Sequence, residues 1–292
     1  SVKKLLGEFR KLAEAGEKAQ EKAESDRTGD EQKALTRWRS FVTQFNKPLK
    51  EGLYSDWGNR DELIEIIRFK STAGEGSGDN WTGLAEYVQR MRTGQKSVYY
   101  IAGSDESTLR SSPLLEAYKV KNFEVLILPD EIDDIVIGSY GKYKDFDLKP
   151  VNRAGTDDEL GIDKKDGEAQ EKNAQPVIDK LKTALGERVK DVRFSRRLSE
   201  SPACIVLDEN DPSVQMERMM KAMGQPDIPE VKLILEVNAG HPLVASLKGA
   251  ENKAHIEDVA QVLLGQALLV EGRELKDSAD FVKRLNRLLQ GV

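Results

Sequence analysis

The side chains best suited to nucleophilic or metal chemistry are few in this sequence, which has one cysteine and two histidines. Cys204 lies in the apolar run Ala203–Leu207 with no histidine near it in sequence, so we expect a buried thiol rather than a nucleophile. His241 and His255 are fourteen residues apart, a separation that does not match a metal-ligand pair. His241 precedes Pro242, which indicates a turn at a helix start. We therefore predict no catalytic residue and no metal ligand.

Two further patterns resemble catalytic or phosphate-binding motifs but lack their context. Acidic pairs such as Asp133-Asp134 and Asp157-Asp158 are expected on the surface of a chain with 33% charged residues. The loop Gly74–Gly78 is rich in glycine, yet it follows a predicted helix and no Gly-Lys-Ser/Thr closes it. Neither pattern predicts an enzyme, although an α/β enzyme that uses carboxylates or Cys204 stays open as an alternative.

A cluster of methionines is a stronger signal. Four of the five methionines fall within eight residues, at positions i, i+3, i+4 and i+7: Met216, Met219, Met220 and Met223. Asp211 as N-cap, Pro212 in the first turn and Gly224 at the end predict one helix with the methionines in one stripe. Flexible thioethers suit a surface that accepts many partners, so we predict a binding stripe. The alternative is a purely structural scaffold with a buried methionine core.

The C-terminal segments Ile256–Val270 and Ser278–Leu289 both carry apolar residues at helical spacing. Such an αα-hairpin buries one face and leaves further apolar surface. We predict that two copies pack as a four-helix bundle across a two-fold axis; the alternative is that this surface rests on its own domain. The residues predicted at the dimer interface are Val259, Leu263, Leu264, Ala267, Leu268, Phe281, Leu285, Leu288 and Leu289.

Composition limits the classes of protein that can carry these features. The chain has 292 residues, 38% of them hydrophobic, and a formal net charge of −6, which favours two globular domains and no nucleic-acid partner. No apolar run approaches the roughly 18–20 residues that cross a bilayer, and no signal peptide is recognisable. One cysteine forms no internal disulfide, which suits a cytoplasmic protein. Because the chain begins with Ser1, we expect it to be a piece of a longer protein.

The first part of the chain is predicted to be a small α/β subdomain with flanking helices, over residues 1–151. Three helices are expected before residue 70, the second ending near Pro48 and the third carrying Leu63, Ile67 and Arg68. Ser97–Ala102 and Glu124–Leu128 are β-rich runs with helical segments between them, which predicts a parallel pair of strands. A helix over Glu131–Ser139 and a strand over Phe146–Val151 follow.

The remaining chain is predicted to be a charged linker and an α+β domain. Residues 152–173 have almost no large apolar side chain, so they are the expected linker. The domain over residues 174–292 begins with a helix at Ala174–Leu185. It continues with three strands and ends in the helical hairpin that dimerises. The strands are expected at Val189–Phe194, Ala203–Leu207 and Val231–Val237.

Several motifs together make a family recognisable. In the first part of the chain they are Arg60–Phe69, Leu84–Met91, Gly94–Lys96, Tyr99–Ile101, Ser112–Glu116, Glu124–Leu126 and Ile132–Asp134. In the second part they are Arg197-Leu198, Ser201–Cys204, Met216–Ala222, Glu236–Asn238 and His241–Val244. From about residue 35 to its end the chain resembles the ninety-kilodalton heat-shock proteins, which are molecular chaperones of the stress response. The bacterial type, high-temperature protein G, is the most similar.

This resemblance implies a function for the predicted surfaces. It implies that the methionine helix binds partly unfolded client proteins, that Asp134 and Ile135 belong to a second client-binding patch, and that the two C-terminal helices hold a homodimer. Ile135 departs from the aromatic residue that bacterial members often have, and Pro212 departs from the usual start of the methionine helix. The resemblance also implies that the ATPase domain, with its ATP and magnesium, lies ahead of Ser1. This chain should therefore bind no cofactor and hydrolyse no ATP. The polar stretch within residues 13–34 has no role in the family that we can assign.

Overall fold

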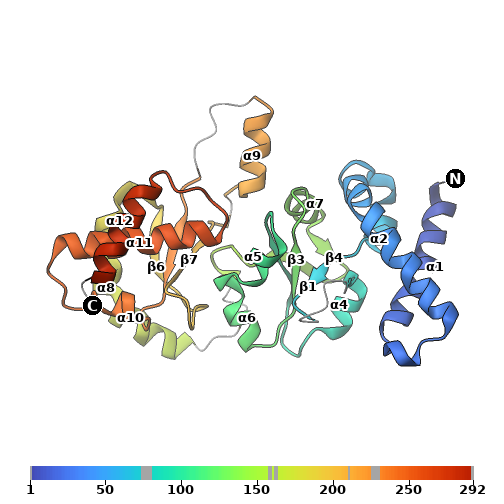
Figure 1. The fold of residues 1–292 in the computed structure, drawn as a ribbon, viewed down its shortest axis with the longest axis horizontal. Helices are drawn as coiled ribbons and strands as arrows, with labels where there is room; N and C mark the ends of the chain where they lie inside the picture. The colour runs from blue at the N-terminus through green and yellow to red at the C-terminus, as the bar shows by residue number, and fades with distance from the viewer. Residues whose placement is uncertain are drawn as a thin grey trace. The chain divides into compact units, whose positions relative to one another are not determined.

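The computed structural model describes residues 2–73, 81–156, 160, 164–209, 211–224 and 231–290. The chain forms two compact units, Ser1–Ala102 with Glu124–Lys149, and Gly103–Phe123 with Pro150–Val292. Figure 1 shows the ribbon and labels many of its helices and strands. The loop Gly74–Gly78 and the pair Asp157-Asp158 lie outside the described residues.

The first unit begins with two long helices, α1 (Val2–Gln20) and α2 (Gly29–Ser55), joined through a short 3-10 turn, η1 (Glu24–Asp26). They pack side by side as a hairpin (Figure 1). The approach is close at Gly16, where an added Cβ would lie 2.3 Å from Trp38 Cβ. Thr28 caps α2, since its Oγ1 accepts from Glu31 N at 3.3 Å and its N–H donates to Glu31 Oε2 at 2.8 Å. The polar stretch within residues 13–34 therefore lengthens both helices and forms their connection.

The prediction that the second helix ends near Pro48 is wrong, because α2 continues to Ser55. Proline removes one intrahelical hydrogen bond. Contacts made by the residues after Pro48 offset the lost hydrogen bond. Leu53 is fully buried, and Lys50, 2% exposed, forms an ion pair at 2.6 Å with Asp133.

The third helix is shorter than predicted and η2 (Trp57–Asn59) precedes it: α3 spans only Arg60–Ile64. The Asn46 side chain prevents the helix from continuing through Arg68. Its Nδ2 donates to Arg68 O at 2.8 Å and its Oδ1 accepts from Arg68 N at 2.9 Å. A side chain of α2 thus takes the backbone groups that another helical turn would use, and the chain extends into β1 (Lys70–Ser71).

The first unit is centred on a five-stranded mixed sheet of order β1-β3-β2-β5-β4. The predicted parallel pair is confirmed, as β2 (Ser97–Ala102) runs parallel to β3 (Val125–Leu128), with Tyr99 opposite Val125. The other two strands are β4 (Lys142–Tyr143) and β5 (Phe146–Pro150), which pair antiparallel. Two further helices, α4 (Leu84–Arg90) and α7 (Asp133–Tyr140), complete the unit.

The segment that connects β2 to β3 packs with the second unit. It contains α5 (Glu106–Arg110), η3 (Pro113–Leu115) and α6 (Glu116–Val120). The Glu116 carboxylate accepts hydrogen bonds from the backbone N–H groups of Ser199 at 2.7 Å, Glu200 at 2.9 Å and Ser201 at 3.1 Å. These bonds lower the pKa of Glu116 against the opposing effect of burial. A carboxylate held this way fastens α6 to the loop before β7.

The second unit is built on a three-stranded mixed sheet of order β6-β8-β7. Its strands are β6 (Asp191–Phe194), β7 (Ala203–Val206) and β8 (Ile234–Val237), with β6–β8 parallel and β7–β8 antiparallel. The helices are α8 (Lys164–Leu185), α9 (Val214–Ala222), α10 (Pro242–Ala245), α11 (Lys253–Val270) and α12 (Ser278–Gln290), with η5 (Gly186–Arg188) after α8.

The expected fold class is confirmed: both units mix helices with a sheet, and a helix pair ends the chain. The helix predicted to start at Ala174 begins earlier, at Lys164. Within the predicted linker, Thr156 and Leu160 are buried. The buried Arg197 binds the start of that segment, since its Nη2 donates to Arg153 O at 3.2 Å. Its Nη1 donates to Val151 O, just before the segment, at 2.6 Å. Much of the predicted linker is therefore structured.

Candidate functional site

The four clustered methionines lie on or next to α9, and none of them is buried. Met216, Met219 and Met220 are partly exposed, and Met223, just after the helix, is 67% exposed. Among the described residues, α9 has no extensive packing against another helix or strand. In Figure 1 it stands apart from β6 and β7 of its own unit. The buried methionine core of the alternative interpretation is therefore not what the structure contains.

The predicted cap of this helix is wrong. The N-cap is Ser213, whose Oγ accepts from Met216 N at 3.1 Å, and the first helical residue is Val214. Asp211 instead forms an ion pair with Lys190 at 3.3 Å. Serine directly before a helix is as good a cap as aspartate, so the sequence contained a second candidate two residues later. The shift leaves the methionines on one face.

Asp134 and Ile135 lie on α7 and are partly exposed. The first residue of α7, Asp133, is fully buried and pairs with Lys50 of α2 at 2.6 Å. This ion pair anchors the helix to α2. Burial raises the pKa of Asp133 to about 6, with the Lys50 charge opposing the shift. A buried ion pair of this kind costs desolvation but sets one orientation. It fixes which face of α7 is directed outward.

The predicted interface residues on α11 lie in the core of their own unit. Val259 and Leu263 are fully buried, and Ala267 and Leu264 are only 3% and 7% exposed. Their side chains leave almost no area for a second protomer. Leu268 is partly buried against the same core.

The exposed apolar residues of the hairpin lie on α12 and at the end of α11, where Leu269 is 49% exposed. Leu289 is 66% exposed, while Phe281, Leu285 and Leu288 are partly exposed. The association of two protomers stays a prediction. Of the nine predicted interface residues, those on α12 are accessible to a second protomer, whereas most of those on α11 are buried.

Two contacts fix α12 on α11. Gly265 allows a close approach, since a Cβ there would lie 2.4 Å from Phe281 Cδ2. Asp258 accepts from Arg284 Nη1 at 2.9 Å, Arg287 Nε at 2.7 Å and Arg287 Nη2 at 2.6 Å. The hydrogen bond from Arg287 is the largest cause that lowers the pKa of Asp258. Together these contacts hold the exposed side chains of α12 in a defined orientation.

The geometry does not favour the enzyme alternative. Cys204 is buried, as predicted, and burial raises the pKa of its thiol well above the ordinary value. Its Sγ donates a weak hydrogen bond to Glu236 Oε2 at 3.9 Å, a carboxylate already paired with Arg197 at 2.9 Å. A protonated, buried thiol beside a negative charge is a poor nucleophile.

His241 also has a structural role. His241 caps α10, and its Nδ1 accepts from Leu243 N at 3.2 Å. Across the part of the chain that the structure describes, no group of three or more histidine, cysteine or acidic side chains could hold a metal ion. Within the same part, no helix is both long and apolar enough to cross a membrane.

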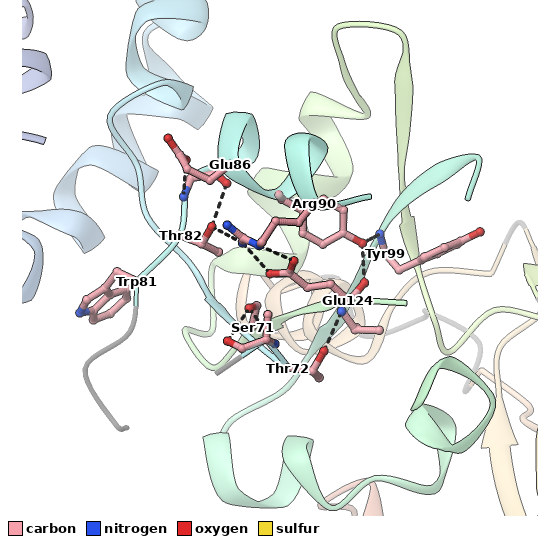
Figure 2. Close-up of polar contacts among 12 residues, drawn as sticks. Ser71, Thr72, Trp81, Thr82, Glu86, Arg90, Tyr99 and Glu124 are labelled. Atoms are coloured by element: carbon pink, nitrogen blue, oxygen red, sulfur yellow. Dashed lines mark hydrogen bonds and ion pairs between the residues drawn. The ribbon is translucent and has the colours of Figure 1, made fainter. Parts of the chain in front are cut away.

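The most connected polar network of the first unit lies between α4 and the start of β3 (Figure 2). Arg90 donates from Nε to Glu124 at 3.0 Å and from Nη2 to Glu124 at 2.8 Å and to Thr82 Oγ1 at 2.7 Å. The Tyr87 hydroxyl donates to Glu124 O at 2.5 Å and accepts from Gln95 at 2.9 Å, and burial raises its pKa. Because Arg90 occupies the Glu124 carboxylate, this network fastens α4 to the sheet and offers no free acid or base.

Reasoning from the sequence missed one exposed feature, which is Trp57. Its side chain is 72% exposed, whereas Trp38 is buried. The short sequence Asp56–Asn59 between two predicted helices was a signal of a surface turn, but it does not by itself separate an exposed ring from one folded back on the core.

Comparison with known proteins identifies one family that matches the chain. The model of the family described as "Hsp90 protein" matches residues 1–292. The chain is 57% identical over 294 residues to "Chaperone protein HtpG" of Treponema denticola, covering 100% of this chain and 43% of that protein. Proteins of the same name from Treponema pallidum and Wolinella succinogenes are 48% and 39% identical, each over 99% of this chain. The chain thus spans about 43% of the length of its first relatives.

Proposed function

The chain belongs to the Hsp90 family, and from that premise we propose that it binds partly unfolded client proteins through the α9 methionines and associates with a second copy through α12. The observation that carries this proposal is the exposure of the methionine stripe, with Met223 67% exposed and Met216, Met219 and Met220 partly exposed. Apolar side chains on a helix with little packing of its own are available to a partner.

The physical basis is weak binding distributed over several flexible side chains. A partly unfolded protein exposes apolar segments of no fixed shape. Unbranched thioethers re-pack against many such shapes, and each contributes on the order of 1 kcal/mol or less when its apolar area is buried. A serine cap and a helix of nine residues present the side chains in one stripe without tying them to the core.

Self-association would add to this weak binding. If Leu285, Leu288 and Leu289 of α12 pack against their copies, each dimer carries two methionine stripes. A client segment that reaches both gains effective concentration without any new contact. Asp134 and Ile135 on α7 are a further proposed contact, as the resemblance implies.

ATP hydrolysis belongs, in this proposal, to the part of the longer protein that lies outside this chain. Among the described residues, Asp133 pairs with Lys50, Glu124 with Arg90 and Glu236 with Arg197, and the Cys204 thiol is buried. None of these groups is arranged as a catalytic group. We therefore propose a passive holding activity for this chain in the cytoplasm, with ATP and magnesium bound elsewhere in the longer protein.

The test is a double substitution, Met219→Ser with Met220→Ser. We expect weaker suppression of the aggregation of a heat-denatured model protein such as citrate synthase, with no ATP added, and an unchanged sedimentation coefficient. Val120→Ser is the matched control, because Val120 is a 72% exposed apolar residue of the same unit outside the stripe. Equal suppression by the double variant and the unaltered chain would contradict the proposal.

Self-association is tested separately with Leu289→Glu. This residue is 66% exposed, so the substitution leaves the protomer folded while placing a charge in the proposed interface. We expect the sedimenting species to shift from dimer to monomer. A dimer of undiminished affinity would exclude α12 from the interface.

A further inference from the structure

Trp57 is the most exposed aromatic side chain among the described residues, at 72%. It begins η2, the turn between α2 and α3. A solvent-exposed indole ring forgoes the burial that would stabilise a fold by a few kcal/mol, so the fold does not use this ring for its own core. Tyr54, 44% exposed, precedes it by one turn at the end of α2.

Trp57 is nevertheless held in place by Arg60. The Arg60 guanidinium lies over the Trp57 ring, 4.4 Å from its centroid, and also over the Tyr140 ring at 5.3 Å. Its Nε donates to Leu53 O at 3.0 Å and its Nη2 to Ser139 Oγ at 3.1 Å. A cation between two rings with two hydrogen bonds has a restricted orientation. We call Trp57, Arg60 and Tyr140 the aromatic platform.

The platform is continuous with the outward face of α7. Ser139 and Tyr140 end that helix, and Ile135 lies one turn before Ser139. Ile135 is partly exposed and Ser139 is exposed. The helix α7 therefore carries both the partly exposed Ile135 and, at its end, the Ser139 and Tyr140 side chains that contact Arg60, all within the first unit.

The surroundings of the platform are acidic. The segment Tyr54–Glu65 contains four carboxylates and one guanidinium. Asp61 accepts from the Tyr140 hydroxyl at 3.2 Å, and Asp56 accepts from Asn59 Nδ2 at 2.7 Å. The one positive charge of this segment, on Arg60, already lies over the Trp57 and Tyr140 rings. A partner with apolar groups and positive charge would meet both an open indole face and uncompensated carboxylates.

We propose that the aromatic platform binds apolar, positively charged segments of partly unfolded proteins, as an extension of the α7 contact that selects clients by charge. This inference rests on the proposed client-binding function, but it concerns a different unit of the chain from the methionine stripe. Trp57 supplies the apolar contact, Arg60 positions the ring, and the carboxylates around them favour cationic segments.

The experiment uses two unstructured peptides of leucine, glycine and serine, one with interspersed lysine and the other with glutamate at the same positions. Binding to the whole chain is followed by tryptophan fluorescence and checked by isothermal calorimetry. We expect the lysine peptide to bind more tightly and to shield Trp57 from acrylamide. Trp57→Ala should weaken its binding by about tenfold, as loss of a buried aromatic contact does, while Trp57→Phe should retain most of it. Added salt should weaken the binding.

Controls separate this inference from the methionine proposal. Phe45→Ala removes another exposed aromatic ring of the first unit, 47% exposed, and should leave the affinity unchanged. Met219→Ser with Met220→Ser should still show the Trp57-dependent signal, so failure of the methionine stripe would not remove it. Equal affinity of Trp57→Ala and the unaltered chain overturns the proposal, as does equal affinity for the two peptides. A change in sedimentation caused by Trp57→Ala would instead assign the platform to contact with a second copy, and would also overturn it.

Discussion

Two helices of the second unit, α9 and α11, both carry apolar side chains at helical spacing, and the structure places them in opposite environments. On α11, Val259 and Leu263 are fully buried, and the helix packs against α8, β7 and α12. On α9, Met219 and Met220 remain partly exposed, and Met223 is 67% exposed.

The width of the apolar face explains this difference. The buried residues of α11 include neighbours in sequence such as Val259-Ala260 and Val262-Leu263-Leu264, so apolar groups cover most of its circumference, and such a helix belongs in a core. The methionines of α9 alternate with Glu217, Lys221 and other polar residues. A helix with a narrow apolar stripe can bury only that one face. The helical periodicity does not specify whether the surface that packs against the stripe belongs to the same protomer or to a partner.

The largest expected effect contrasts one residue from each helix. Leu263→Glu places a charge in a fully buried site and should cost about 5 kcal/mol or more, which is comparable with the whole stability of a domain. Met219→Glu, at a partly exposed site, should change stability by less than about 1 kcal/mol. Urea denaturation followed by circular dichroism measures both. Similar losses of stability in the two variants would break the distinction between a closed and an open helix.

A smaller effect is expected where α12 is fastened to α11. Asp258→Asn removes the charge that Arg284 and Arg287 share, and should destabilise the hairpin by about 2 kcal/mol at neutral pH. The pKa of Asp258 is lowered, chiefly by the bond from Arg287. Its contribution is therefore present above about pH 4 and is lost as the pH falls through the lowered pKa. Thermal unfolding should show the variant and the unaltered chain converging in acid. A constant difference across that range would contradict the assignment.

The turn of the hairpin predicts a change with pH in the opposite direction. Burial raises the pKa of Glu271 from 4.5 to about 7. The folded state then binds the proton more tightly than the unfolded state, so the stability from this group is present below about pH 4.5 and is lost as the pH rises to about 7. Glu271→Gln should remove that part of the slope of unfolding free energy against pH, whereas Glu274→Gln, an exposed residue of the same turn, should keep it. If the unfolding free energy varied with pH in the same way in all three proteins, Glu271 would be hydrated in the folded state and the prediction would be wrong.

The smallest effect concerns the cap of α9. Ser213→Ala removes the acceptor for Met216 N and should weaken the helix by about 1 kcal/mol. Hydrogen exchange should speed up at α9 alone, because this helix has little packing to transmit the change. Asp211→Ala is the control, since Asp211 pairs with Lys190 instead of capping. Equal acceleration of exchange in α11 would mean that α9 is coupled to the core.

Local structure was largely predictable from sequence. The strand Ser97–Ala102 has the predicted bounds, and the parallel pairing of β2 with β3 follows from the helical segments between them. Family motifs such as Ser201–Cys204 were recognisable without any structure, and the family match covers residues 1–292. These features depend on the periodicity of apolar side chains and on short sequence motifs, both of which can be identified directly in the sequence.

Where local rules failed, a distant residue had intervened. α2 passes Pro48 because Lys50 pairs with Asp133 more than eighty residues later, and α3 stops early because Asn46 takes the backbone of Arg68. The segment Gly103–Phe123 packs with the second unit through Glu116 and the loop of Ser199–Ser201. No window of a dozen residues contains such partners.

The sequence by itself determined that α9, α11 and α12 are helices with apolar side chains at helical spacing, and that the chain resembles one family of chaperones. Only the tertiary structure decided which apolar side chains are buried inside the protomer, such as Val259 and Leu263, and which are exposed to solvent, such as Met223, Leu289 and Trp57. The reason is physical: helical periodicity follows from neighbours three and four residues apart, whereas burial is the sum of contacts with elements far away in the chain.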